Sequence, residues 1–137
     1  MLLDMQTLYS DAQAITNAAT SENVVKLASN QFKMTEVAFG TPIPMDIRVT
    51  EDFAGITALK VAFETSATED FAEAETLVEV TEDDADKLVA GYIFPIKYVP
   101  KGNKGYTRLN YTPTGTATSG RITAGLVMSH DNSYQDM

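Results

Sequence analysis

Hydrophobic and polar residues alternate with a period of two along much of the chain, a pattern typical of β-strands that bury one face. β-branched and aromatic residues are common in these stretches, as in most sheets. No stretch shows a long helical period. The alternating stretches, which predict about seven or eight short strands, are 24–28, 45–50, 59–64, 76–80, 92–98, 108–111 and 122–128.

Turn-forming residues separate these stretches. Proline and glycine at 42–44, 53–55 and 113–115 predict connections between strands, and residues 100–105 predict a hairpin loop. Pro95 stands inside an alternating stretch and cannot donate to a ladder, so it predicts an edge strand or a bulge. The class is therefore all-β and antiparallel: a β-sandwich, a jelly roll or a small barrel.

One short helix is expected between Thr81 and Gly91. Thr81 can cap it, Asp83 and Asp84 suit the positive end of a helix dipole, and Lys87 suits the other end. Parallel βαβ folds need long crossover helices. Their absence from the pattern argues against an α/β enzyme.

The two ends of the chain differ from its middle. Residues 1–23 predict an extended N-terminal arm, which either adds an edge strand or reaches a neighbouring subunit. Residues 24–129 predict one β-sandwich domain, and residues 130–137 a flexible tail. The apolar side chains of the arm are Leu2, Leu3, Met5, Leu8 and Tyr9.

The chain has 137 residues, a formal net charge of −9 and no cysteine. The negative charge disfavours nucleic acid and anionic membranes as partners. Without cysteine there are no disulfides, thiolate metal sites or cysteine nucleophiles. The first residues lack a basic region and a long apolar core, so we expect no signal peptide and synthesis in the cytoplasm.

Few residues fit catalysis or cofactor binding. His130 is the one histidine and lies in the polar tail, where Ser129 and Asp131 are its sequence neighbours. A triad requires groups brought together by a rigid fold. The acidic stretch 69–86 lacks the spacing of an EF-hand, and no phosphate-binding loop is present. We therefore expect no enzyme, cofactor or metal, and the sequence leaves weak cation binding by 69–86 open.

Four basic residues lie in or near the C-terminal stretches. They are expected either to form one basic face that docks on an acidic protein or to be ordinary solvated strand residues. The four are Lys101, Lys104, Arg108 and Arg121.

Six segments stand in this order along the chain: Leu3-Asp4, Ser10-Asp11-Ala12-Gln13-Ala14, Leu88-Val89-Ala90-Gly91-Tyr92, Tyr106-Thr107-Arg108-Leu109-Asn110-Tyr111-Thr112, Gly115-Thr116 and Gly120-Arg121-Ile122-Thr123-Ala124-Gly125-Leu126-Val127. Together they resemble the Bbp16 family of tailed-phage capsid cement proteins. The resemblance implies a jelly roll on the outer capsid surface that bridges major capsid subunits and has no catalytic residues. The loop at 101–105 is longer than the family's usual turn.

The resulting hypothesis is a non-enzymatic cement, or decoration, protein of the virion. Its partners would be the major capsid protein and itself, as a homo-dimer or homo-trimer. The alternative is a carbohydrate- or receptor-binding jelly roll on the virion. The candidate interface residues are Leu2, Leu3, Met5, Leu8, Tyr9, Lys101 and Lys104.

Overall fold

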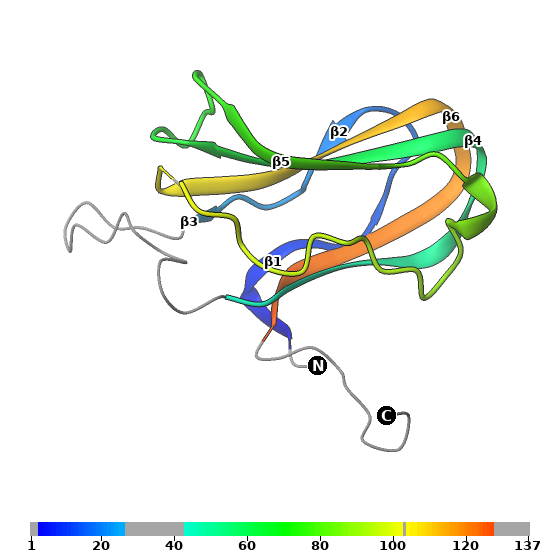
Figure 1. Cartoon of the computed structure of the whole chain (residues 1–137), viewed down its shortest axis with the longest axis horizontal. Coiled ribbons are helices and arrows are strands. Elements are labelled where there is room, and N and C mark those ends of the chain that lie inside the picture. Colours follow the sequence, from blue (N-terminus) through cyan, green and yellow to red (C-terminus); the bar gives the residue numbers. More distant parts are fainter. Residues whose placement is uncertain (1–2, 27–42, 103, 128–137) are drawn as a thin grey trace, which may run out of the picture.

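The computed structural model describes residues 3–26, 43–102 and 104–127 (Figure 1). They form an antiparallel sheet of six strands, which confirms the all-β class. In chain order the elements are β1 (Leu3–Ala14), β2 (Ala19–Thr20), β3 (Val25–Lys26), β4 (Met45–Ser66), β5 (Glu75–Glu82), the 3-10 turn η1 (Ala85–Lys87) and β6 (Tyr106–Val127).

Two 22-residue strands, β4 and β6, form the centre of the fold. They pair from Met45–Leu126 to Ser66–Tyr106, with register shifts between Val49 and Ala58. The ribbon bends sharply at these shifts and folds back over itself (Figure 1). The turn signals at 53–55 and 113–115 therefore bend continuous strands, and the expectation that they connect separate strands was wrong.

Gly55 shows why the bend needs a residue without a side chain. Its φ is +87°, and a Cβ there would stand 2.7 Å from the carbonyl oxygen of Thr116 in β6. Any other residue would meet both backbone strain and a backbone clash. The glycine thus lets the two strands stay close while they turn.

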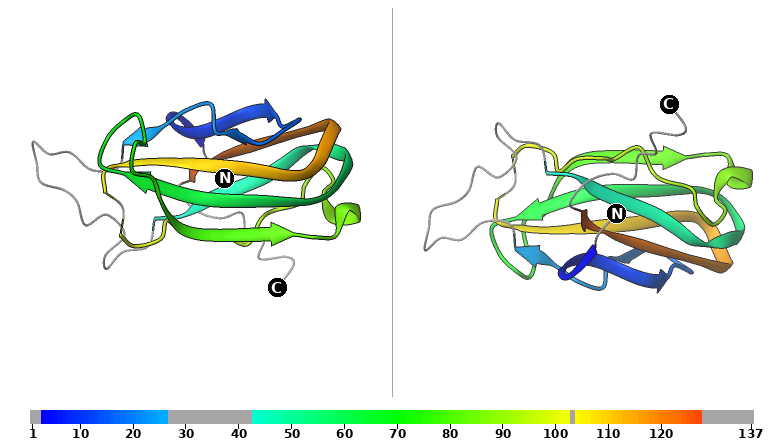
Figure 2. Two further views of the ribbon diagram at one scale, coloured as in Figure 1. Left: turned by 90° about the horizontal axis from the view of Figure 1, so that it is seen from above. Right: turned by 90° about the horizontal axis from the view of Figure 1, so that it is seen from below.

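The bend divides the structure into two facing layers (Figure 2). In each layer, β6 and β4 are flanked by one segment on either side. The first layer contains, in order, β1, residues 119–127 of β6, residues 45–52 of β4, and residues 88–99. The second contains β2 and β3, residues 106–115 of β6, residues 56–66 of β4, and β5.

The regular strand expected at 92–98 is absent. The segment runs beside β4 and is bonded to it, but it makes only isolated bridges such as Arg48–Ile93. Between the bonds of Phe94 to Ile47 and of Met45 to Lys97, β4 advances two residues while the segment advances three. The extra residue near Pro95 makes a bulged edge, in agreement with what Pro95 indicated.

The expected helix between Thr81 and Gly91 is a single 3-10 turn at 85–87. Thr81 remains in β5, where it pairs with Lys60, so it cannot cap. Asp84 caps the turn instead, because its carboxylate accepts a hydrogen bond from the backbone N–H of Asp86. The cap is therefore three residues later than the Thr81 that the sequence predicted.

The N-terminal segment is part of the sheet. β1 pairs with β6 from Leu3–Val127 to Ala14–Arg121, and β2 and β3 follow β6 toward its start. Residues 3–26 thus line one edge of β6 around the bend. This is the edge-strand alternative left open above.

The core lies between the layers and takes side chains from both. Tyr9 of β1 meets Phe63 of β4 edge-to-face, with ring centroids 6.0 Å apart. The largest fully buried side chains of the core are Tyr9, Tyr111, Phe63, Phe94, Ile15, Met45, Ile47, Leu59, Leu88, Leu109, Ile122 and Val49.

Two buried tyrosine hydroxyls join the layers. The Tyr9 hydroxyl lies 2.8 Å from Thr107 Oγ1, and the Tyr111 hydroxyl lies 2.7 Å from Ser10 Oγ. The Thr107 hydroxyl donates to the carbonyl oxygen of Val25, and Ser10 donates to a side chain of its own strand. Each tyrosine hydroxyl is therefore the donor, and burial raises the pKa of both tyrosines above the ordinary value.

We predict that Tyr9→Ala lowers the free energy of unfolding by about 3–5 kcal/mol, because it removes a buried ring and an inter-layer hydrogen bond. The matched control, Tyr98→Ala, removes a side chain that is 51% exposed and should cost less than about 1 kcal/mol. Denaturant unfolding followed by circular dichroism measures both. Equal losses would contradict a core role for Tyr9.

We also predict that the protein loses stability as pH rises above 10, the ordinary tyrosine pKa. The unfolded chain releases phenolic protons there, while folded Tyr9 and Tyr111 keep theirs because their pKa values are raised. Unfolding free energies measured from about pH 8 to pH 12 should fall less steeply for the Y9F/Y111F variant. An identical slope in the variant would refute this linkage.

Candidate interaction surfaces

Arg108, one candidate for the basic face, is paired and partly shielded within the second layer. Its Nε lies 2.9 Å from Glu64 Oε1 of β4, and its guanidinium lies 4.2 Å from the centroid of the Phe71 ring. The side chain is only 22% exposed. It is therefore a structural group of the second layer.

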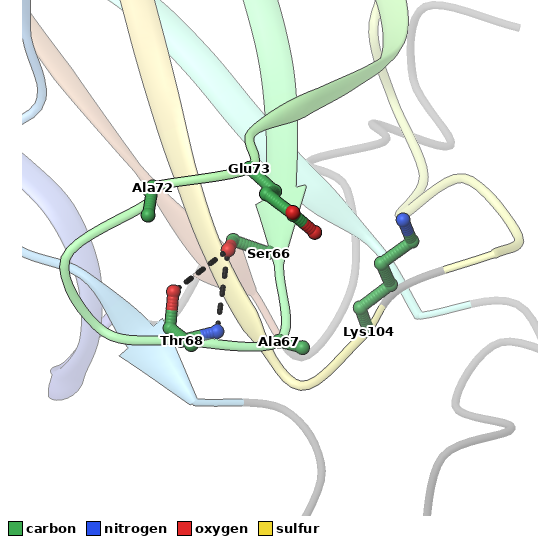
Figure 3. A pocket seen from close by; sticks show the side chains of 6 residues that line it. All are labelled: Ser66, Ala67, Thr68, Ala72, Glu73 and Lys104. Carbon is green, nitrogen blue, oxygen red and sulfur yellow. Dashed lines mark hydrogen bonds between the residues drawn. The ribbon is translucent and has the colours of Figure 1, made fainter.

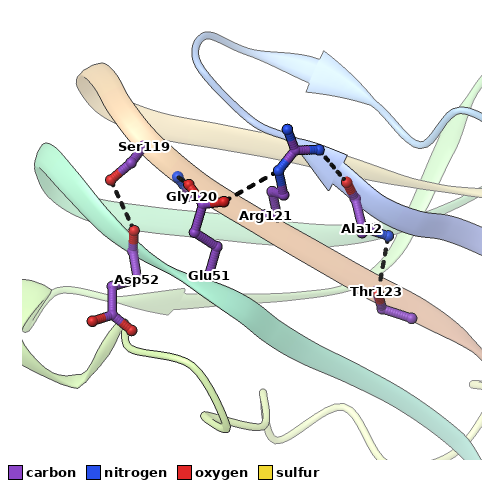
Figure 4. Close-up of polar contacts among 7 residues, drawn as sticks. All are labelled: Ala12, Glu51, Asp52, Ser119, Gly120, Arg121 and Thr123. Carbon is purple, nitrogen blue, oxygen red and sulfur yellow. Dashed lines mark hydrogen bonds and ion pairs between the residues drawn. The ribbon is translucent and has the colours of Figure 1, made fainter.

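Arg121 belongs to a different polar cluster, at the bend (Figure 4). It pairs with Glu51 of β4 at 3.2 Å and donates to the carbonyl oxygen of Ala12 in β1. The N–H of Ala12 donates to Thr123 Oγ1, which holds a backbone with a φ of +46°. Arg108 and Arg121 thus lie in different layers, so the four residues do not form one basic face, which was one of the two alternatives above.

Lys101 and Lys104 are exposed in the connection that precedes β6. Lys104 Nζ lies 2.9 Å from Glu75 Oε2, and this hydrogen bond raises the pKa of Lys104. The Lys104 backbone N–H donates to Thr65 Oγ1 of β4. The loop is therefore tied to both β4 and β5.

A pocket of about 340 Å³ opens beside Lys104 and the connection between β4 and β5 (Figure 3). Ser66 Oγ accepts a hydrogen bond from the backbone N–H of Thr68. The Thr68 hydroxyl donates to Asp70, and this bond lowers the pKa of that carboxyl. No aromatic ring lines the pocket, whose lining residues are Ser66, Ala67, Thr68, Ala72, Glu73 and Lys104.

The N-terminal candidates lie on a different part of the molecule. Tyr9 is fully buried, so its side chain cannot contact a partner as expected, and Leu8 is half-buried. Both bond through their backbone oxygens to Asn23, between β2 and β3. Leu3 and Met5 lie in β1, and Leu2 falls outside the described residues, as do His130 and the tail 130–137.

An apolar edge that the sequence argument missed lies on residues 88–99. Val89, Ile93 and Tyr98 are 44%, 39% and 51% exposed. The Arg48–Ile93 bridge is flanked by the bonds of neighbouring residues, so the N–H and C=O of Ile93 point away from β4. The sequence signal for this edge was Ile93, an apolar residue between Tyr92 and Phe94 in the predicted strand.

The acidic residues near this edge serve structural roles. Glu82 accepts hydrogen bonds from the Tyr92 hydroxyl and the Asp84 backbone N–H, and both lower the pKa of its carboxyl. Burial raises the pKa of Tyr92 to about 12, with Glu82 adding to the shift.

Among the described residues, no three His, Asp or Glu side chains gather as a metal site. Nor is any described helix long and apolar enough to cross a membrane.

The sequence profile of the Bbp16 family matches residues 9–126, from β1 almost to the end of β6. The chain belongs to the Bbp16 family. The matched range includes both layers and the bend between them. No curated protein matches the chain.

The two arginines of β6 differ in exposure, so we predict that their removal lowers the free energy of unfolding by different amounts. Arg108→Gln should cost about 1–2 kcal/mol of unfolding free energy, because the guanidinium is shielded by Glu64 and the Phe71 ring. Arg121→Gln, whose side chain is 50% exposed, should cost about 0.5 kcal/mol or less. Denaturant unfolding of the two variants checks this, and a larger loss for Arg121→Gln would contradict it.

Proposed function

We propose that the chain is a non-enzymatic capsid cement, or decoration, protein of a tailed bacteriophage. It is made in the host cytoplasm, binds the outer surface of the capsid and stabilises contacts between major capsid subunits. The observation that carries this proposal is the Bbp16 family match over residues 9–126. That match spans the folded core rather than one local motif.

We infer that the double-layered sheet is a jelly roll. Eight extended segments, counted as halves of β4 and β6 plus their flanking segments, lie in two layers of four. The chain changes layer at each bend, and each layer takes strands from both ends of the chain. Paired Greek keys with this kind of connectivity are characteristic of jelly rolls.

The fold suits a protein that must resist shear. Because β4 and β6 each run through both layers, separating the layers would require breaking one continuous ladder. The buried tyrosine bonds to Thr107 and Ser10 add attachments between the layers. A rigid body of this kind can carry load between the capsid subunits that it contacts.

The contacts with capsid would come from exposed groups at the margins of the layers. The loop with Lys101 and Lys104 offers cations, and the 88–99 edge offers Val89 and Ile93. Many copies on one lattice bind with avidity, so each contact can be modest. We propose a homo-dimer or homo-trimer placed at symmetry-related joints, as closed symmetry favours.

The alternative, a carbohydrate- or receptor-binding jelly roll, receives less support. Sugar sites in lectin-like jelly rolls use loop aromatics together with acids. The pocket beside Lys104 has no aromatic lining, and Tyr9 and Tyr111 are buried. A glycan-binding screen of the purified protein tests this alternative directly.

We predict saturable co-sedimentation with expanded capsids that lack the protein, together with a raised capsid melting temperature. K101E/K104E should weaken binding several-fold at low salt, because the loop cations are reversed. K26E/K87E is the control, since it changes the charge equally at exposed positions outside the loop and outside β5. Binding that is absent for the native protein would remove the proposal, and equal binding by both variants would remove the loop from the interface.

A further inference from the structure

The negative charge of the chain is concentrated in one segment. Residues 69–86 contain nine carboxylates and no basic residue, whereas the other residues contain ten acids and ten bases. The formal charge of −9 therefore equals the charge of this segment alone. Solubility would be served equally well by scattered acids, so the clustering calls for a local explanation.

This segment contains the edge strand of the second layer. β5 (Glu75–Glu82) pairs with β4 on one side, and its other side faces outward at the margin opposite β1 and β2 (Figure 2). On an edge strand, alternate residues turn their backbone N–H and C=O groups away from the sheet. β5 is eight residues long and contains no proline, unlike the 88–99 edge. Its pairing with β4 shifts register once, between Thr76 and Val78, and is regular from Val78 to Glu82.

Basic residues of the same chain offset only part of this charge. Lys104 pairs with Glu75 at 2.9 Å, and Lys60 approaches Glu79 at 3.9 Å. Both pairs are half-exposed, with side-chain exposures between 42% and 58%, so solvent screens them. The edge consequently retains a field that attracts cations and repels a second acidic edge.

We propose that the outer edge of β5 binds a basic, extended segment of the capsid surface, which pairs with β5 as an added strand. This inference rests on the proposed function for the identity of the partner. Strand addition supplies affinity through backbone hydrogen bonds, and alternate side chains supply specificity. Two β5 edges would bring like charges together, which disfavours pairing between copies of the chain.

The two faces of β5 define the side chains that such a segment needs. Val78 and Val80 stand opposite the buried Phe63 and Val61 and pack against the core, whereas Glu79 stands opposite Ala62 on the other face. A paired strand would place its own alternate residues beside these. The segment should therefore alternate apolar residues with lysine or arginine.

The first test uses peptides and the isotope-labelled full-length protein. A ten-residue peptide that alternates valine with lysine should shift the amide resonances of residues 75–82 in a saturable manner, and added salt should weaken binding. A peptide with glutamate in place of lysine is the control. Equal shifts with both peptides, or shifts centred on β1, would overturn the inference.

The second test uses capsids and two charge-matched variants. E73Q/E75Q/E79Q removes two carboxylates of β5 and that of Glu73 just before it. The affinity of this variant in co-sedimentation should fall at least tenfold at low salt. The control variant D11N/E22Q/E51Q removes three carboxylates elsewhere and should bind like the native protein. Retained binding by the β5-edge variant would overturn the inference and leave the cement function standing.

Two further outcomes separate the partners. Peptide binding by a protein that does not bind capsids would overturn the capsid partner and the proposed function, while supporting β5 as a site for basic strands. Self-association in sedimentation equilibrium that is lost in E73Q/E75Q/E79Q would assign the edge to a second copy and overturn the inference.

Discussion

The continuous pairing of β4 with β6 through a sharp bend is the constraint on which the rest of the structure depends. The ladder runs from Met45–Leu126 to Ser66–Tyr106, and the bend places its two halves in opposite layers. Every other segment attaches to an edge of this ribbon. The layers therefore cannot slide independently, and the core between them is enclosed by one hydrogen-bonded sheet.

Burial between the layers decides which polar groups are available for binding. The hydroxyls of Tyr9 and Tyr111 are used within the core, and the guanidinium of Arg108 is used within the second layer. These groups hold the scaffold together. The groups left for recognition are at the margins, where backbone edges and loop side chains meet solvent.

The two margins on the side away from β1 differ in chemistry. The 88–99 edge is apolar and contains Pro95, whereas β5 contains no proline, has one register shift between Thr76 and Val78, and is strongly acidic. Proline protects an edge from pairing, while charge selects the partner that can approach. One side of a single domain thus presents an apolar contact surface next to a selective strand-pairing surface, which suits a protein proposed to sit across subunit joints.

The sequence alone determined the all-β class and the position of β5, because alternation with a period of two records which residues face the core. It also marked Pro95 as an edge or bulge, because proline lacks an N–H. Only the tertiary structure decided that 53–55 and 113–115 bend strands instead of ending them, since this depends on Gly55 meeting Thr116 across the ribbon. It likewise placed Tyr9 in the core and Arg108 in an ion pair, because contacts between residues about a hundred or about forty positions apart leave no local pattern.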